Sequence, residues 1–142
     1  MEIKIKRFDE SLPIPQYEDG AAGFDFFCRI DMTIAPNEIK GVPANVALVV
    51  PKDHVLLVVP RSSTPTRTGL IMPHSIGVID PFFCGDDNEI QLIFKNTTDK
   101  PVTIKKGDKL AQGLLIKCEK TIFKEVKKLK KLNVENFNYD RN

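Results

Sequence analysis

The sequence contains few cysteines, and this scarcity excludes two kinds of scaffold. Cysteine occurs only at positions 28, 84 and 118 of 142, an odd number whose spacing is neither paired nor typical of metal ligands. We therefore expect no disulfide framework and no zinc site, and we expect a reducing compartment. A chain of this length can form one domain whose core is large enough to dispense with cross-links.

Long apolar runs and a dominant charge sign are also missing. The first eight residues mix charged and apolar side chains in alternation, and no stretch reaches the length of a membrane span. The 21 Lys and Arg residues nearly balance the 19 Asp and Glu residues, which leaves a net charge of +2. We expect a cytoplasmic protein that binds neither a membrane nor nucleic acid.

Helical periodicity is scarce, whereas short strand-like segments separated by proline and glycine are frequent. Two Val-rich runs flanking Pro-Lys-Asp, residues 41–50 and 54–59, predict a hairpin of buried strands. Alternating or β-branched segments predict further strands at residues 2–8, 24–34, 89–95, 102–104 and 110–117. This pattern is typical of an all-β barrel or sandwich.

One window, residues 120–132, has the spacing of a helix. Its apolar residues recur at intervals of four, three and three, at Ile122, Val126, Leu129 and Leu132. Its lysines could form a basic stripe for nucleic acid, but a solvated face is the preferred interpretation because no aromatic residues are interleaved. These lysines are Lys124, Lys127, Lys128, Lys130 and Lys131. Without repeats or composition shifts, we expect one domain over residues 1–132 and a flexible tail over residues 133–142.

The segment Pro-Arg-Ser-Ser at residues 60–63 is a candidate anion-binding turn. The guanidinium of Arg61 offers a planar fork to phosphate oxygens, and the hydroxyls of Ser62 and Ser63 with turn amides can complete the site. Taken alone, the triplet fits a surface turn capped by serine better.

Asp80 is a candidate general base. It ends the apolar run Gly-Val-Ile and precedes Pro81, so its backbone enters a constrained turn where a carboxylate could orient water. The alternative is an ordinary Asp-Pro turn, with Phe82 and Phe83 as core aromatics. Residues 107–112 read by default as a turn leading into a strand, with Gln112 on the exposed side.

The order of four segments resembles the motifs of the trimeric dUTP nucleotidohydrolase (dUTPase) family, over residues 1 to about 132. Ala-Gly-Phe-Asp-Phe at 22–26 is similar to the first motif and Pro-Arg-Ser-Ser at 60–63 to the second. Gly-Val-Ile-Asp at 77–80, with an aromatic three residues after the Asp and a glycine five after it, is similar to the third. Gly-Asp-Lys-Leu-Ala-Gln at 107–112 is similar to the fourth.

This resemblance implies a dUTPase-like β-barrel, related to β-clip and jelly-roll folds, that hydrolyses dUTP to dUMP and pyrophosphate. Asp80 would activate the water that attacks the α-phosphorus, and Phe83 would lie under the deoxyribose where the family usually has Tyr. Asp25 would bind water on a magnesium ion that the phosphates hold, so that no protein side chain is a direct metal ligand. The triphosphate would be bound by Arg61, Ser62, Ser63 and Gln112.

The resemblance also implies how the base is recognised and how the subunits assemble. Backbone groups of the turn before Gly77, together with His74 and Ile79, would read uracil; many relatives have Asn where this chain has His74. The expected assembly is a homotrimer with shared sites. One subunit would supply the uracil-binding turn and Asp80, the next the Arg61 segment and Gln112, and the third a closing tail.

That closing tail is a Gly-rich motif with Arg and Phe, which is not found among residues 133–142. The sequence stops about where it would begin, so we expect the motif to follow Asn142; a natural loss of the lid would weaken catalysis.

Two other functions are considered. The related dCTP deaminases share an Arg-Ser-Ser segment and an Ile-Asp-Pro turn, but at the position of their catalytic glutamate this chain has Ile93, and Glu89 does not align with it. The other is a non-catalytic nucleotide-binding or regulatory module that has the same fold without turnover.

Overall fold

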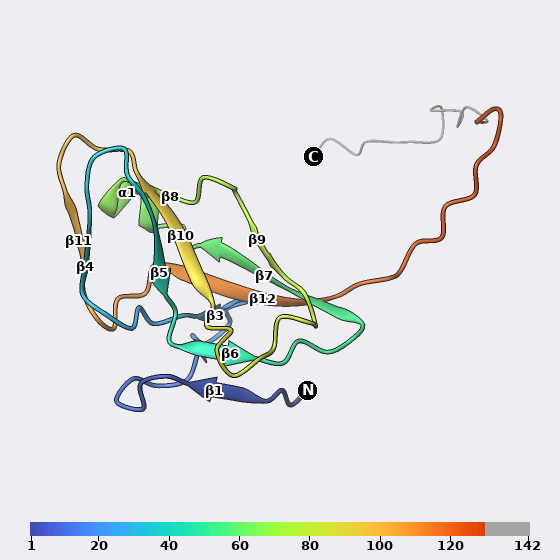
Figure 1. Cartoon of the computed structure of the whole chain (residues 1–142), viewed down its shortest axis with the longest axis horizontal. Coiled ribbons are helices and arrows are strands. Elements are labelled where there is room, and N and C mark those ends of the chain that lie inside the picture. Colours follow the sequence, from blue (N-terminus) through green and yellow to red (C-terminus); the bar gives the residue numbers. More distant parts are fainter. Residues whose placement is uncertain (130–142) are drawn as a thin grey trace.

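The computed structural model describes residues 1–129 of the chain (Figure 1). The predicted tail, residues 133–142, and the last part of the helix-like window lie outside this range. Four antiparallel sheets and one short helix make up the described part, which confirms the prediction of an all-β protein. Within residues 1–129, no helix has both the length and the apolar character needed to cross a membrane.

The largest sheet has five strands and carries most of the predicted site. Its order is β2 (Gln16–Tyr17), β3 (Phe24–Asp25), β12 (Ala111–Lys117), β7 (His54–Pro60) and β9 (Gly77–Ile79). The long strands β7 and β12 pair along their whole length, from Ala111 opposite Pro60 to Lys117 opposite His54. They form the rigid centre of the sheet.

The remaining strands form three smaller sheets around the same core. Strand β1 (Ile5–Arg7) pairs with β6 (Val46–Leu48), and β11 (Val102–Ile104) pairs with β4 (Met32–Ile34). The third sheet is β5 (Ile39–Pro43), β10 (Gln91–Asn96) and β8 (Leu70–Ile71). Alternation of buried and less buried side chains along β10 shows why its apolar residues form a strand. The core side chains from these sheets include Phe26, Ile34, Leu56, Leu70, Leu92 and Phe94.

The predicted hairpin between residues 41–50 and 54–59 is wrong. Strand β6 pairs with β1, while β7 pairs with β12 and β9. Both segments are apolar, with β6 buried and β7 partly buried, so the sequence locates the strands but contains no local signal for their partners. The predicted strand at 24–34 is also divided, because only β3 and β4 at its two ends form ladders.

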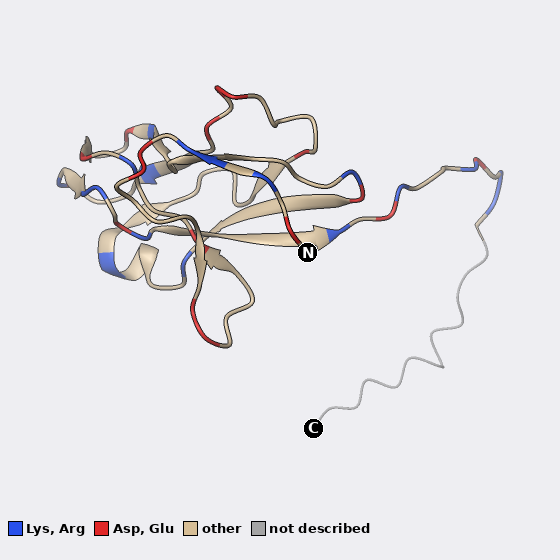
Figure 2. Cartoon of the chain, turned by 90° about the horizontal axis from the view of Figure 1, so that it is seen from below, with Lys and Arg blue, Asp and Glu red and all other residues tan. Residues whose placement is uncertain are grey.

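The helix-like window is not helical over its described part, residues 120–129. This segment continues from β12 without helix or strand and extends away from the barrel (Figure 1). Ile122, Phe123 and Leu129 are 94%, 92% and 88% exposed, so the apolar side chains contact no core that would stabilise a helix. Figure 2 shows basic and acidic residues interspersed along this segment and over the body.

The one helix among residues 1–129, α1 (Thr64–Thr68), was not predicted, because Thr-Pro-Thr-Arg-Thr has no helical periodicity. Pro65 lies in its first turn, where its missing N–H leaves no helical hydrogen bond unmade. Gly69 ends the helix with φ 71° and donates its N–H to the Pro65 carbonyl at 2.9 Å. The helix thus turns the chain immediately after the Arg-Ser-Ser segment.

Candidate active site

The central strand β12 brings three of the four motifs together. Gln112 lies opposite Asp25 on β3, and Ala111 lies opposite Pro60 at the end of β7. Beyond the ladder, the Arg61 N–H donates to the Leu110 carbonyl at 3.1 Å. Segments that are distant in sequence therefore lie on adjacent strands with a fixed register.

A buried hydroxyl, that of Thr64, holds the end of the Arg-Ser-Ser turn against the segment before β12. Thr64 is 2% exposed, and its Oγ1 donates to the Leu110 carbonyl at 2.7 Å. Ser63 precedes α1 but makes no side-chain capping bond. No partner for the hydroxyl of Ser62 or Ser63 is found among residues 1–129. The serine-cap interpretation is therefore wrong, and both hydroxyls are available to a ligand.

Two basic and two acidic side chains meet beside this turn. Asp25, whose side chain is 7% exposed, has Oδ1 at 3.1 Å from Arg61 Nε and Oδ2 at 3.2 Å from Lys109 Nζ. The more exposed Glu18 has Oε1 at 3.1 Å from Arg61 Nη2 and 3.4 Å from Lys109 Nζ. Lys109 also lies over the Phe27 ring, 5.5 Å from its centroid. The buried carboxylate thus fixes the direction of both cations.

A cavity of about 140 Å³ opens beside this cluster. Gly23 lets the Gln112 side chain and the backbone of β12 approach the cavity wall, since a Cβ there would lie 2.7 Å from Gln112 Oε1 and 3.2 Å from the Gly113 carbonyl. The structure thus brings together four predicted residues, Asp25, Arg61, Ser62 and Gln112, whereas Ser63 lines an adjoining cavity of about 290 Å³. The first cavity is lined by Glu18, Ala21, Gly23, Asp25, Arg61, Ser62 and Gln112.

The residues present fit a metal that is held through its water. Asp25 Oδ2 is buried and accepts no hydrogen bond, although its charge is balanced by Lys109 nearby. Such an oxygen can accept from water on a cation. Over residues 1–129 no group of three or more His, Cys, Asp or Glu side chains is arranged so that it could hold a metal ion.

The second group of predicted residues lies at the far edge of the same sheet. Strand β9 pairs with β7 so that Gly77 is opposite Val58 and Ile79 is opposite Leu56. Asp80 therefore leaves the sheet near the start of β7, while Arg61 follows its end. The position of Asp80 along β7 and that of Arg61 are six strand residues apart, which corresponds to about 20 Å. One chain does not place Asp80 beside the ionic cluster of Asp25, Arg61, Lys109 and Glu18.

The loop around Asp80 is held by local contacts. The Phe83 N–H donates to the Asp80 carbonyl at 3.0 Å, and Phe83 packs partly against the core. The expectation that Phe82 is a core aromatic is wrong, since it is 82% exposed. In the described chain the Asp80 carboxylate has neither a hydrogen-bond donor nor a cationic partner. It is half-buried and open to water.

The proposed uracil-binding turn is exposed. His74 and Ser75 lie at its tip, and Ser75 has φ 66°, in the left-handed region. The Ser75 N–H donates to the Met72 carbonyl at 3.0 Å, and the Ile76 N–H donates to the His74 carbonyl at 2.8 Å. The turn is thus shaped by its own backbone, and the His74 side chain is free to contact a ligand.

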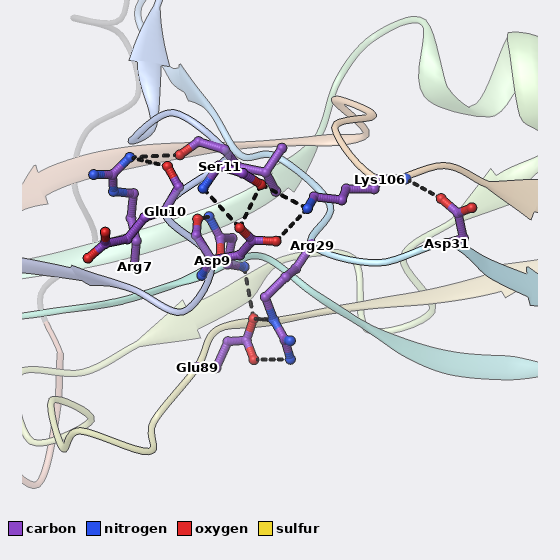
Figure 3. A network of polar contacts seen from close by, with 10 residues as sticks. Arg7, Asp9, Glu10, Ser11, Arg29, Asp31, Glu89 and Lys106 are labelled. Carbon is purple, nitrogen blue, oxygen red and sulfur yellow. Dashed lines mark hydrogen bonds and ion pairs between the residues drawn. The ribbon is translucent and has the colours of Figure 1, made fainter.

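Glu89, the one carboxylate near the position of a deaminase base, has a structural role (Figure 3). Its oxygens accept from Arg29 Nε at 2.8 Å and Nη2 at 2.9 Å, and Oε1 also accepts from the Asn45 N–H at 2.9 Å. The side chain is 9% exposed. A carboxylate bound in this way is not placed to move a substrate proton.

Sequence reasoning gave no role to two members of the ionic cluster, Lys109 and Glu18. Lys109 lies inside the fourth motif, at residues 107–112, and this membership is its only signal in the sequence. Glu18 has no sequence signal, because only the fold brings residue 18 beside residues 61 and 109.

Comparisons with known proteins identify the family of this chain. A family model described as dUTPase matches residues 10–141. The deoxyuridine 5'-triphosphate nucleotidohydrolase of Dictyoglomus turgidum is 33% identical over 132 residues, covering 89% of this chain and 88% of that protein. The dUTPase structure from Streptococcus mutans superposes with a TM-score of 0.78 at 29% identity, over 84% of this chain and 98% of that one. A mutant dUTPase from phage phi11 of S. aureus, whose structure concerns the coordination of a structural Mg(II) ion, has a TM-score of 0.79 at 20% identity, over 92% and 100%. The chain belongs to the dUTPase family.

Proposed function

We propose that the chain hydrolyses dUTP to dUMP and pyrophosphate, with Asp80 as the base for the attacking water. The family membership supplies the reaction. The observation that carries the assignment of residues is the convergence of three motifs on one polar cavity with two fixed cations. A triphosphate is the polyanion that such a cavity suits.

The phosphate-binding cluster stabilises the charge that develops on the leaving group. Arg61 offers its fork, Ser62 and Ser63 offer unpaired hydroxyls, and Gln112 offers an amide at the cavity wall. Magnesium held through the phosphates would supply further charge neutralisation, and Asp25 Oδ2, which accepts no hydrogen bond within the chain, would accept one from water on the ion. These groups are fixed before the reaction, so little reorganisation is needed when the charge develops.

Asp80 activates the nucleophile. Its carboxylate takes a proton from water as the water oxygen bonds to the α-phosphorus and the bond to the α,β-bridging oxygen breaks. Pyrophosphate then leaves with the electrons of that bond. The absence of a cationic partner for Asp80 within the described residues leaves both of its oxygens free for water.

The residues around Asp80 select the nucleoside. Phe83 presents a ring for the deoxyribose, which leaves no room for a 2′-hydroxyl, and the turn bearing His74, Gly77 and Ile79 reads the uracil edge through backbone groups. The exposure of this turn supports the assignment, because its N–H and carbonyl groups must reach a ligand.

We also propose a homotrimer in which each active site takes residues from different subunits. The separation of about 20 Å between Asp80 and Arg61 along β7 supports it, since one site needs both residues. Exposed Ile122, Phe123 and Leu129 also support association, because they form an apolar segment without cover in one chain. Sedimentation of the protein as a 16.0 kDa monomer would contradict this part.

A reducing, cytoplasmic compartment is part of the same proposal. Cys28, Cys84 and Cys118 are all free thiols. Burial raises the pKa of Cys28 to about 12, so that this thiol stays protonated and inert. Exposed Cys84 lies next to Phe83, where oxidation would alter the nucleoside loop.

Incubation with dUTP and magnesium tests the function. We expect stoichiometric pyrophosphate and dUMP from dUTP, and little product from UTP or dTTP. Ammonia from dCTP would identify a deaminase instead, and nucleotide binding without any product would identify a non-catalytic module.

A further inference from the structure

Glu18 contacts the two cations that face the phosphate cavity. A single oxygen, Oε1, lies 3.1 Å from Arg61 Nη2 and 3.4 Å from Lys109 Nζ. One anionic oxygen shared by a guanidinium and an ammonium group is also the arrangement that a phosphate oxygen would adopt there. Glu18 is part of the cavity wall, together with Asp25 and Ser62.

The two carboxylates of the cluster differ in their freedom to move. The side chain of Asp25 is 7% exposed and lies within the β3 to β12 ladder, whereas that of Glu18 is 59% exposed and follows the end of β2. Glu18 is held by a turn in which its carbonyl accepts from the Ala21 N–H at 2.9 Å and Gly20 has φ 75°. Glu18 can swing into solvent without disturbing a strand, and Asp25 cannot.

We propose that Glu18 is an internal competitor of the substrate: its carboxylate occupies Arg61 and Lys109 in the free protein and is displaced when a di- or triphosphate binds. The inference rests on the proposed function, since it assigns this cavity to phosphates. The three residues belong to one chain, so the contact is complete within a single subunit.

The physical consequence is a weaker affinity for phosphates than the same cations would otherwise give. A phosphate must replace an existing ion pair, and the departing carboxylate remains near the incoming anion. Exposed ion pairs are modest in strength, so the expected effect is about three- to fivefold in affinity, decreasing with salt. If Glu18 instead only orients Arg61, its removal would weaken phosphate binding, which is the opposite sign.

The test compares Glu18→Gln with Asp19→Asn. Both remove one negative charge from neighbouring exposed residues, but Asp19 makes no ion pair with Arg61 or Lys109 in the described structure. Titration calorimetry with pyrophosphate should give a Kd about three- to fivefold lower for E18Q at low salt, a smaller difference at about 0.5 M salt, and wild-type affinity for D19N. The KM for dUTP should fall in parallel in E18Q.

Unchanged or weaker pyrophosphate binding by E18Q would overturn the proposal, as would an equal gain in D19N, which would indicate a general charge effect. Thermal unfolding of both variants verifies that they are folded. Because pyrophosphate binding requires no turnover, this result stays readable even if the wild-type protein fails to hydrolyse dUTP, an outcome that would count against the proposed function alone.

Discussion

The proposed phosphate half of the site, which we define as Asp25, Arg61, Lys109 and Gln112, has two residues on the paired strands β3 and β12 and two just outside the ladders of β7 and β12. The nucleoside half, residues 72–85, is a set of turns at the edge of the same five-stranded sheet. In the phosphate half, the ladder of β3 and β12 fixes Asp25 and Gln112, and the buried Asp25 carboxylate holds Arg61 and Lys109 by ion pairs. In the nucleoside half the contacts are local, and side chains such as His74 and Phe82 are exposed.

The difference fits the ligands that we propose for the two halves. Charges that stabilise a leaving group are most effective when they are oriented before the reaction in a site that partly excludes water. A neutral base is read by backbone groups that must be accessible, and a water-activating carboxylate must face solvent. The two halves therefore need different environments, and one subunit provides them at opposite ends of β7.

The largest expected effect comes from removing the base in the nucleoside half. Asp80→Asn should lower kcat for dUTP hydrolysis by about 10²–10⁴, since the amide cannot accept the proton from water. Binding of a non-hydrolysable dUTP analogue should persist, because the phosphate half is untouched. Pyrophosphate release and calorimetry measure the two quantities. Undiminished hydrolysis would remove the role of Asp80.

Combining defects from the two halves tests whether they belong to different subunits. Asp80→Asn and Arg61→Ala should each be nearly inactive alone. Trimers refolded from an equal mixture should recover about one quarter of wild-type activity, because each site takes its halves from two independently drawn subunits. Refolding the double variant with an equal amount of inactive Asp80→Asn chain is the control and should recover nothing. No recovery in the mixture would place both halves in one subunit.

A stability comparison between the halves should give the next effect. In Gly113→Ala, the new Cβ would lie 2.5 Å from Phe24 Cε2 and Cζ and 3.0 Å from Leu56 Cδ1, so overpacking should destabilise the sheet by about 1–3 kcal/mol. In Gly85→Ala, the Cβ meets mainly the Asn88 side-chain oxygen, which can move into solvent at the loss of one exposed hydrogen bond from the Gly85 N–H. Thermal unfolding at equal protein concentration should show a lower Tm for G113A and little change for G85A. Equal shifts would mean that the two halves are equally rigid.

Thiol alkylation should give the smallest effect. Cys84, in the nucleoside half, is exposed, whereas Cys28, three residues after Asp25, is buried and its pKa is raised to about 12. At about pH 8, Cys84 should react with iodoacetamide and Cys28 should not, because alkylation requires the thiolate. A bound dUTP analogue should slow the reaction of Cys84 as read by mass spectrometry. Fast labelling of Cys28 in the folded protein would contradict the rigid description of the phosphate half.

The sequence predicted the positions of the strands better than it predicted which strands pair. The strands at 102–104 and 110–117 are close to β11 and β12, since each is a short β-rich run between clear turns. The hairpin at 41–59 was wrong, because two buried apolar runs contain no information on register or partner. The window at 120–132 had helical spacing, but residues 120–129 have no apolar surface to pack against within the chain.

By itself the sequence determined the chemistry of the candidate site: the order of motifs and the residue types Asp25, Arg61, Gln112 and Asp80 are local properties of the chain. Only the tertiary structure decided which of them are neighbours. It placed Arg61 and Lys109 on the same two carboxylates, Glu18 and Asp25, and left Asp80 at the other end of β7. The physical reason is that long-range strand pairing sets these distances, and pairing is chosen by the packing of the whole core rather than by any one segment.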